Sequence, residues 1–313
     1  MIRIAGAGLA GCTLARVLAE KGKQCTVFES KSVVGGLCAD MLQGGNYTQL
    51  YGPHIFHTNH DIVWDFLSDF TGWIPYEHRV FSKVGERYIE VPITEEDVLK
   101  NNDTVPYEFP QSSMEVCLSR FGMSATLGLM EPYSKKQWGK SLFDIPSEVC
   151  ARLHPRKSRL NGYFTDKYQG IPDLGFTQLC MNLLQHPNIT LLLNSGMIED
   201  EVDFFSGDIG GEYRTVVFKF SQGALPYPVV NYPDKNTPYL RRSMPLQFIN
   251  PKRKDGVVCT ETFLDRGGVR AYPIGEFTSS YKDTVFLGRL GTHRYLNMDT
   301  VVKEAMEIAN ENS

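Results

Sequence analysis

The feature that most constrains the fold lies at the N-terminus, where three glycines separate a short apolar stretch from a helical one. Residues 1–5 have the apolar character of a buried strand, and the run 12–21 has apolar residues at helical spacing. Between them stands Gly6-Ala7-Gly8-Leu9-Ala10-Gly11, and a second strand is predicted over 25–29. A strand, a G-x-G-x-x-G turn, a helix and a strand within about 30 residues predict a dinucleotide-binding unit.

Each glycine has its own physical role in such a turn. Gly6 permits the tight turn, Gly8 lets a pyrophosphate approach the backbone, and Gly11 lets the helix pack close to the sheet. The free N–H groups at the start of the helix then face the phosphates. Glu29 ends the second strand, 18 residues after Gly11, where its carboxylate can bond an adenosine ribose.

A pair of glycines favours FAD over NAD. Gly35 and Gly36 follow Glu29 closely, and this extended pattern resembles the glutathione-reductase-like family of FAD proteins. Residues 284–287 are predicted to form a strand and 298–310 a helix, and such a late unit commonly returns to the FAD domain in that family. The sequence contains no second nucleotide fingerprint, so no dedicated NAD(P)H domain is expected. The expected FAD contacts are Gly6, Gly8, Leu9, Ala10, Gly11, Glu29, Gly35, Gly36, Leu37, Arg289 and Met298.

Length and composition set broader limits. The chain has 313 residues, which suggests two or three packed units. A net charge of −4 without a long basic run argues against a general nucleic-acid binder. Seven cysteines without C-x-x-C spacing predict buried free thiols in a reducing cytoplasm rather than a disulfide framework or a metal site. No stretch approaches the roughly 20 apolar residues of a membrane helix.

The middle of the chain is predicted to weave between units. The expected fold class is α/β, with a Rossmann-like FAD-binding domain, an inserted small helical domain and an antiparallel β-sheet domain. Residues 1–72, about 176–211 and 282–313 are assigned to the FAD-binding domain. Residues about 95–150 are assigned to the helical domain, and about 73–94, 151–175 and 212–281 to the antiparallel sheet substrate domain.

Several short segments, taken in order, resemble the UDP-galactopyranose mutase family. They are YGPHIFHT at 51–58, YSKKQWG at 133–139, DKYQGIP at 166–172, GEYRT at 211–215, TPYLR at 237–241, YP at 272–273 and GRL at 288–290. The set spans nearly the whole chain, and the segments with Trp138 and Pro172 are the most diagnostic. The helical middle is shorter than in the usual bacterial members.

The resemblance implies a flavin-dependent isomerase that interconverts UDP-galactopyranose and UDP-galactofuranose, as galactofuranose biosynthesis requires. In that family N5 of reduced FAD attacks the anomeric carbon with UDP as leaving group, the sugar ring opens and recloses, and UDP returns. The implied partners are UDP-galactose and a reductant such as NAD(P)H, and the oligomeric state is left open. Because the cofactor carries the hard chemistry, the protein mainly positions and stabilises the substrate.

The resemblance also implies roles for individual residues. Arg156 and Arg241 match the clamp on the substrate diphosphate, since a guanidinium fork suits phosphate oxygens. His54 matches a histidine on a loop against the flavin, and these three residues are the implied catalytic group. Trp138 matches the position that stacks on uridine. The other implied substrate contacts are Tyr133, Tyr168, Tyr272, Tyr295, Asn297 and Glu261.

The chain departs from the family pattern at the substrate site. Asn297 stands where the family usually has an aspartate, and an amide does not supply that negative charge. Leu129 and Met130 stand where aromatic residues often flank the uridine. Two other functions therefore stay open at this point: an amine-oxidase- or desaturase-like oxidoreductase, in which substrate reduces the flavin, and a non-catalytic FAD-binding relative.

Overall fold

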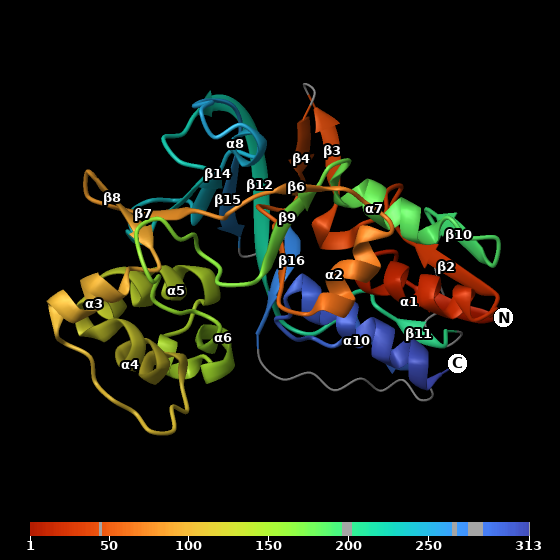
Figure 1. Ribbon diagram of the computed structural model, residues 1–313, viewed down its shortest axis with the longest axis horizontal. Helices are drawn as coiled ribbons and strands as arrows, with labels where there is room; N and C mark the ends of the chain where they lie inside the picture. Colours follow the sequence, from red (N-terminus) through yellow and green to blue (C-terminus); the bar gives the residue numbers. More distant parts are fainter. Residues whose placement is uncertain (44–45, 196–201, 265–267, 275–283, 313) are drawn as a thin grey trace. The chain divides into compact units, whose positions relative to one another are not determined.

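A computed structural model describes residues 1–43, 46–195, 202–264, 268–274 and 284–312. The chain divides into two compact units. Unit 1 contains residues 1–75, 166–213 and 273–313, and therefore both chain ends, whereas unit 2 contains residues 76–165 and 214–272 (Figure 1). Unit 2 includes the helices and the sheet that the sequence analysis assigned to separate domains; that three-domain division stays a prediction.

Unit 1 is built on a parallel sheet in the order β10-β2-β1-β11-β17. Ile4 and Val27 are fully buried at its centre, as expected for strands covered on both faces. This order and the helices around it confirm the predicted Rossmann-like fold. The strands are β1 (Ile2–Ala5), β2 (Cys25–Glu29), β10 (Ile189–Leu193), β11 (Phe204–Phe205) and β17 (Val285–Phe286).

Helix α1 (Leu9–Glu20) follows the glycine turn and packs between α7 (Gly175–Leu184) and α10 (Met298–Glu311) (Figure 1). It begins three residues before the predicted helix, because the turn closes at Gly8, the N-cap residue. Leu14 and Leu18, one helical turn apart, are fully buried. The helical spacing in the sequence thus marked the face that packs into the core.

Smaller elements complete unit 1. The sheet β5-β9-β6 joins β5 (Phe56–Thr58), β9 (Tyr168–Pro172) and β6 (Trp73–Pro75), and β3 (Asp40–Gln43) pairs with β4 (Asn46–Gln49). The helical pieces are η1 (Gly36–Cys38), α2 (Asp61–Ser68) and α9 (Gly288–Gly291).

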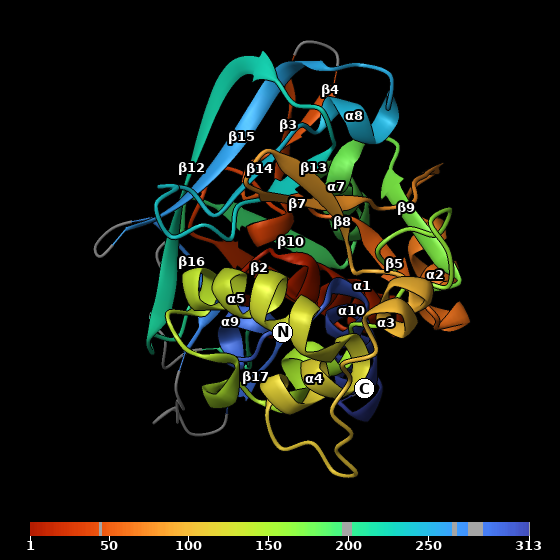
Figure 2. The same ribbon diagram turned by 90° about the vertical axis from the view of Figure 1, so that its left-hand side faces the viewer.

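Unit 2 contains a seven-stranded sheet in the order β16-β12-β15-β14-β13-β7-β8. Its two long strands, β12 (Tyr213–Ala224) and β15 (Asp255–Leu264), run antiparallel to each other (Figure 2). The sheet is mixed rather than antiparallel, since β13 pairs parallel with β7, a strand from a distant part of the chain. The other strands are β7 (Val80–Val84), β8 (Arg87–Val91), β13 (Val229–Asn231), β14 (Arg241–Ser243) and β16 (Val269–Pro273).

The helices of unit 2 include one continuous run. Helix α4 (Ser113–Ala125) leads through a π-helical turn, η2 (Thr126–Met130), into α5 (Glu131–Trp138). The run bends at Gly122, whose φ of 79° suits a residue without a side chain. The shorter helices are α3 (Glu95–Asn101), η3 (Leu142–Asp144), α6 (Ser147–Ala151) and α8 (Leu246–Ile249).

The cysteines and the helices bear on two further expectations. All seven cysteines are buried free thiols. Within the described ranges, none of the helices combines the length and the apolar character that a membrane span requires. Nor do three or more His, Cys, Asp or Glu side chains gather there in a way that could hold a metal ion.

Candidate functional site

The glycine turn of unit 1 has the shape that a pyrophosphate needs. Gly6 has a φ of +92°, and a Cβ on Gly11 would lie 2.0 Å from the carbonyl oxygen of Gly6, so helix and turn touch. A Cβ on Gly8 would meet only the Cα of Gly36, at 3.8 Å, which leaves the face of this turn open. The helix α1 behind it has no side-chain cap, so the N–H groups of its first turn are available to an anion.

Glu29 lies at the end of β2, beside this turn. Its carboxylate accepts hydrogen bonds from the backbone N–H of Ala7, at 2.8 Å, and of Lys31, at 2.9 Å. The Oγ of Ser30 donates a longer bond, 3.4 Å, to the same carboxylate. A carboxylate has about four acceptor positions, so these three bonds leave room for one ribose hydroxyl. The open turn, the uncapped helix and this carboxylate together fit the adenosine diphosphate half of FAD.

The predicted cofactor residues from the C-terminal part lie near the same turn. A Cβ on Gly288 would come within 2.9 Å of the Cβ of Ala10, so the segment with Arg289 passes the start of α1. The guanidinium of Arg289 is held by the carbonyl of Leu296, with Nε at 3.2 Å and Nη2 at 2.6 Å. The Sδ of Met298 lies 3.4 Å from the Sγ of Cys38, in the turn after Gly36.

His54 occupies a loop that one buried glutamine holds. The side-chain amide of Gln49 donates to the carbonyl of His54, and its Oε1 accepts from the His54 N–H at 2.8 Å. The imidazole Nδ1 lies 3.0 Å from the carbonyl of Gly52. Gln49 is 3% exposed and was not singled out in the sequence, because no motif marks a side chain that pairs with a backbone five residues away.

Three predicted substrate residues also belong to unit 1. Tyr168 stacks on Trp64, with ring centroids 4.8 Å apart and planes 8° apart. The ring of Tyr295 lies under the Arg289 guanidinium, 4.6 Å from its carbon. Asn297 is the N-cap residue of α10, and its side chain does not cap the helix. Their roles toward substrate stay predictions.

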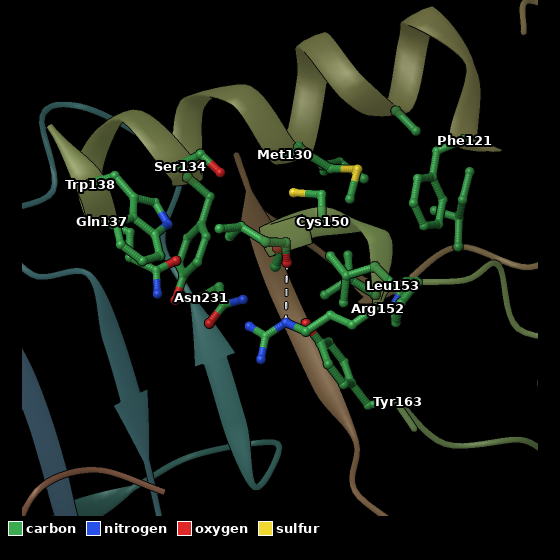
Figure 3. A pocket seen from close by; sticks show the side chains of 18 residues that line it. Phe121, Met130, Ser134, Gln137, Trp138, Cys150, Arg152, Leu153, Tyr163 and Asn231 are labelled. Carbon is green, nitrogen blue, oxygen red and sulfur yellow. Dashed lines mark hydrogen bonds between the residues drawn. The ribbon is translucent and has the colours of Figure 1, made fainter. Parts of the chain in front are cut away.

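Unit 2 contains a cavity of about 100 Å³ beneath the run α4–η2–α5 (Figure 3). Trp138 lies at one end and Phe121 at the other, with Arg152 and Asn231 between them. The lining is mostly apolar with a few polar groups, which is the usual composition of a small-molecule site. Its remaining walls include Ile93, Leu129, Met130, Tyr133, Cys150, Leu153 and Tyr163.

Arg241 forms a two-bond ion pair beside this cavity. Arg241 and Glu261 stand opposite each other on β14 and β15, and Nε and Nη2 donate to the two carboxylate oxygens at 2.7 and 2.9 Å. Glu261 is 1% exposed, whereas the Arg241 side chain is 23% exposed. In the described part of the chain, no protein group accepts a hydrogen bond from Nη1 of Arg241. One edge of the guanidinium is therefore available to a ligand.

Two tyrosines, Tyr133 and Tyr272, lie near Arg241. Loss of hydration raises the pKa of Tyr133 well above its ordinary value, and the nearby Arg241 only partly opposes this. Desolvation lowers the pKa of Arg241, but the Glu261 carboxylate outweighs it, so the guanidinium stays charged. Tyr272 packs edge-on against Trp138, with centroids 5.4 Å apart. Five predicted substrate residues, Tyr133, Trp138, Arg241, Glu261 and Tyr272, are thus brought together in unit 2.

Arg156, the predicted partner of Arg241, is used differently in the structure. It is 2% exposed, donates to the carbonyls of Pro92 and Asn161 at 2.7 and 3.0 Å, and pairs with Glu90 at 3.0 Å. These contacts make it an internal brace of unit 2, and its diphosphate role stays a prediction. The arginine that lines the cavity is Arg152, whose Nε donates to the carbonyl of Val149 at 3.2 Å.

Asn231 is a cavity residue that no sequence motif indicates. It ends β13, is 9% exposed and lines the cavity (Figure 3). Its Oδ1 is buried without a hydrogen-bond partner among the described residues. A buried acceptor left unpaired costs about 1–3 kcal/mol, so a ligand that donates a hydrogen bond there would recover this free energy.

Comparison with known proteins assigns the chain to a family. The family profile described as UDP-galactopyranose mutase matches residues 128–295, and an NAD(P)-binding Rossmann-like domain profile matches residues 4–70. The chain is 31% identical to a dTDP-fucopyranose mutase of Escherichia coli, with 98% of this chain and 97% of that protein covered. The chain belongs to the UDP-galactopyranose mutase family.

Two further relatives extend the comparison. A probable UDP-galactopyranose mutase of Klebsiella pneumoniae is 29% identical, with 99% of this chain and 94% of that protein covered. A solved structure of reduced UDP-galactopyranose mutase has the same fold, with a TM-score of 0.73 and 14% identity over 99% of this chain and 95% of that one. The family is one of FAD-dependent pyranose–furanose mutases, so the chain is a flavin-dependent sugar-nucleotide mutase, as the sequence predicted.

The glycine turn gives a first testable prediction for this mutase. Gly8→Val should yield colourless protein that keeps its fold, because the added side chain fills the open face of the turn. Gly11→Val should lose the fold as well, since its Cβ would lie 2.0 Å from a backbone oxygen. Flavin absorbance and thermal unfolding of the FAD-free proteins distinguish the two. A yellow, fully loaded Gly8→Val protein would contradict the assignment of the phosphate turn.

The Arg241–Glu261 pair gives a second prediction. Arg241→Lys keeps a charge beside Glu261 but loses the guanidinium fork, so kcat/KM should fall by about ten-fold or more. Arg241→Ala should also lower stability, by about 3–5 kcal/mol, because it leaves Glu261 buried and unpaired.

The double variant Arg241→Leu/Glu261→Leu is the control for that prediction. It removes both charges together, so stability should largely return while activity does not. Steady-state kinetics and thermal unfolding measure the two effects separately. Wild-type kcat/KM in Arg241→Lys would remove the guanidinium fork from substrate binding.

Proposed function

We propose that this mutase interconverts UDP-galactopyranose and UDP-galactofuranose. The observation that supports this most is the open edge of the Arg241 guanidinium beside a cavity lined by Tyr133 and Trp138. The chain carries a net charge of −4, so it offers no broad positive field for an anionic substrate. A diphosphate therefore needs cations placed at the site itself.

The residues of unit 2 suit a nucleoside diphosphate that acts as leaving group. Arg241 would bind phosphate oxygens through Nη1 and stabilise the charge that develops as the sugar–phosphate bond breaks. Tyr133 stays protonated at neutral pH, because its pKa is raised, and can donate a hydrogen bond. Trp138 offers a flat apolar ring to the pyrimidine, and Asn231 offers an amide to its polar edge.

The residues of unit 1 suit the cofactor. Reduced FAD, when bound, supplies the nucleophile that reacts at the anomeric carbon of the sugar. The turn at Gly8 and the first turn of α1 would hold its pyrophosphate, and Glu29 its ribose. Gln49 fixes the backbone of His54, which keeps that loop in one position for a role against the flavin.

A second candidate substrate is the pyranose and furanose pair of dTDP-fucose, and one specific observation favours it. The Escherichia coli relative at 31% identity is a dTDP-fucopyranose mutase. Thymine differs from uracil by one methyl group, and Leu129 and Met130 give the cavity apolar walls where the family often has aromatic residues. A methyl group gains about 0.8 kcal/mol from burial against such walls, which corresponds to a few-fold preference.

The proposed reaction predicts activity without net consumption of reductant. Reduced protein incubated with UDP-galactofuranose should produce UDP-galactopyranose in many turnovers per flavin, and chromatography would follow both sugars. Added dithionite or NAD(P)H should be consumed only to reduce the flavin once. One equivalent of reductant oxidised in each turnover would contradict an isomerase and favour the oxidoreductase alternative.

The same assay decides between the two substrate pairs. UDP-galactose and dTDP-fucose should be compared in both ring forms at equal concentrations, with kcat/KM measured for each. Higher kcat/KM for the UDP pair supports the main proposal, whereas higher kcat/KM for the dTDP pair replaces it by the second. Met130→Phe should then shift the ratio toward the uridine nucleotide, since an aromatic ring fills the space of the methyl group.

A further inference from the structure

Lys136 makes an unusual set of contacts in unit 2. Its Nζ donates to the carbonyl oxygens of Tyr232, Asp234 and Tyr239, at 2.7, 2.9 and 2.8 Å. An ammonium group has three N–H donors, so all of them are used on backbone acceptors of one loop, 232–240. Such charge-assisted bonds are about twice as strong as neutral ones.

The loop that Lys136 holds connects two site residues. It begins directly after Asn231, which lines the cavity, and enters β14 at Arg241. Within the loop the N–H of Tyr232 donates to the carbonyl of Leu240 at 2.9 Å, and the N–H of Leu240 donates to the carbonyl of Glu261 at 2.8 Å. The loop is thus tied to the sheet at its ends, and to α5 through Lys136.

Helix α5 carries the other half of the site. Tyr133 and Trp138 lie on either side of Lys136 in the sequence of this eight-residue helix, and both line the cavity. The Nη2 of Arg214 donates to the carbonyl of Lys136 at 3.1 Å, which fixes the C-terminal end of the helix as well. A single ammonium group therefore links the element with the aromatic residues to the loop between Asn231 and Arg241.

The charge of Lys136 is needed for this link. Burial lowers its pKa, and the carboxylate of Asp234 opposes that shift. A neutral amine has only two N–H groups and would leave one of the three carbonyls unpaired. Lys135, the other lysine of α5, could not replace it, since Lys135 is 59% exposed and pairs with Glu131 at 2.9 Å.

We propose that Lys136 is a positioning residue for substrate binding, which keeps Arg241 and Asn231 in register with Tyr133 and Trp138. This inference rests on the proposed function, because it needs a nucleotide in the cavity of unit 2. It assigns no contact between Lys136 and the substrate. Loss of the link should therefore act on the binding of the nucleotide, through displacement of the loop, rather than on FAD.

Lys136→Met and Lys135→Met form a matched pair for the test, since both remove one ammonium from the same helix. Lys136→Met should weaken UDP binding by about ten-fold in calorimetry and raise KM more than it lowers kcat, with FAD content retained. Hydrogen exchange of the amides in 232–240 should become faster. Lys136→Arg, which keeps a charge and several donors, should recover part of the affinity, and Lys135→Met should stay near wild type.

The outcomes separate this inference from the function on which it rests. A wild-type protein that binds neither UDP nor dTDP overturns the proposed function, and the positioning role with it. If the wild type binds UDP and Lys136→Met binds it equally well, the positioning role alone is overturned. The same holds if exchange in 232–240 is unchanged, or if Lys135→Met weakens UDP binding as much.

Discussion

A charged guanidinium can lie in the sheet of unit 2 because a carboxylate stands directly opposite it in the strand register. Arg241 on β14 faces Glu261 on β15, and Glu261 is almost wholly buried. Two of the guanidinium nitrogens neutralise that carboxylate, and the remaining nitrogen is left for a ligand. Burial raises the pKa of the nearby Tyr133, so its phenol stays protonated, and the charge of Arg241 opposes that shift only in part. The proposed substrate site in unit 2 thus depends on one cross-strand ion pair whose cost of burial is offset by its geometry.

The cofactor side depends on a steric constraint instead. The Cα of Gly11 passes so close to the Gly6 carbonyl that no side chain fits there, while Gly8 faces open space. Gly11 is required because there is no space for a side chain, and Gly8 is required because a ligand needs the space beside it. Both requirements select glycine, and both arise within a few residues of the sequence. This explains why a turn of six residues can fit half of FAD, whereas the proposed substrate site needs residues from four separate segments.

Features that depend on neighbouring residues could therefore be predicted from the sequence, whereas roles that depend on contacts between distant segments could not. The Rossmann-like unit followed from glycine spacing and helical periodicity, and the motif that contains Tyr133 and Trp138 pointed to the family. Asn231 and Lys136 gain their roles only through contacts with segments about a hundred residues away, which no spacing reveals. Arg156 is the opposite case: its motif match suggested a contact with substrate, but a motif carries no information on burial. In the structure its guanidinium is buried and holds unit 2 together through the ion pair with Glu90.

The central claim, that the cavity beside Arg241 binds the nucleotide, can be tested through the fluorescence of Trp138. The chain has three tryptophans, and replacing Trp64 and Trp73 by phenylalanine leaves Trp138 as the only one, whose emission is excited selectively at wavelengths that tyrosine does not absorb. UDP should then change the Trp138 emission in a saturable way, with a weaker affinity in the Arg241→Lys background, while free galactose should have no effect. UDP binding detected by calorimetry without any change in Trp138 emission would place the nucleotide elsewhere and contradict the account.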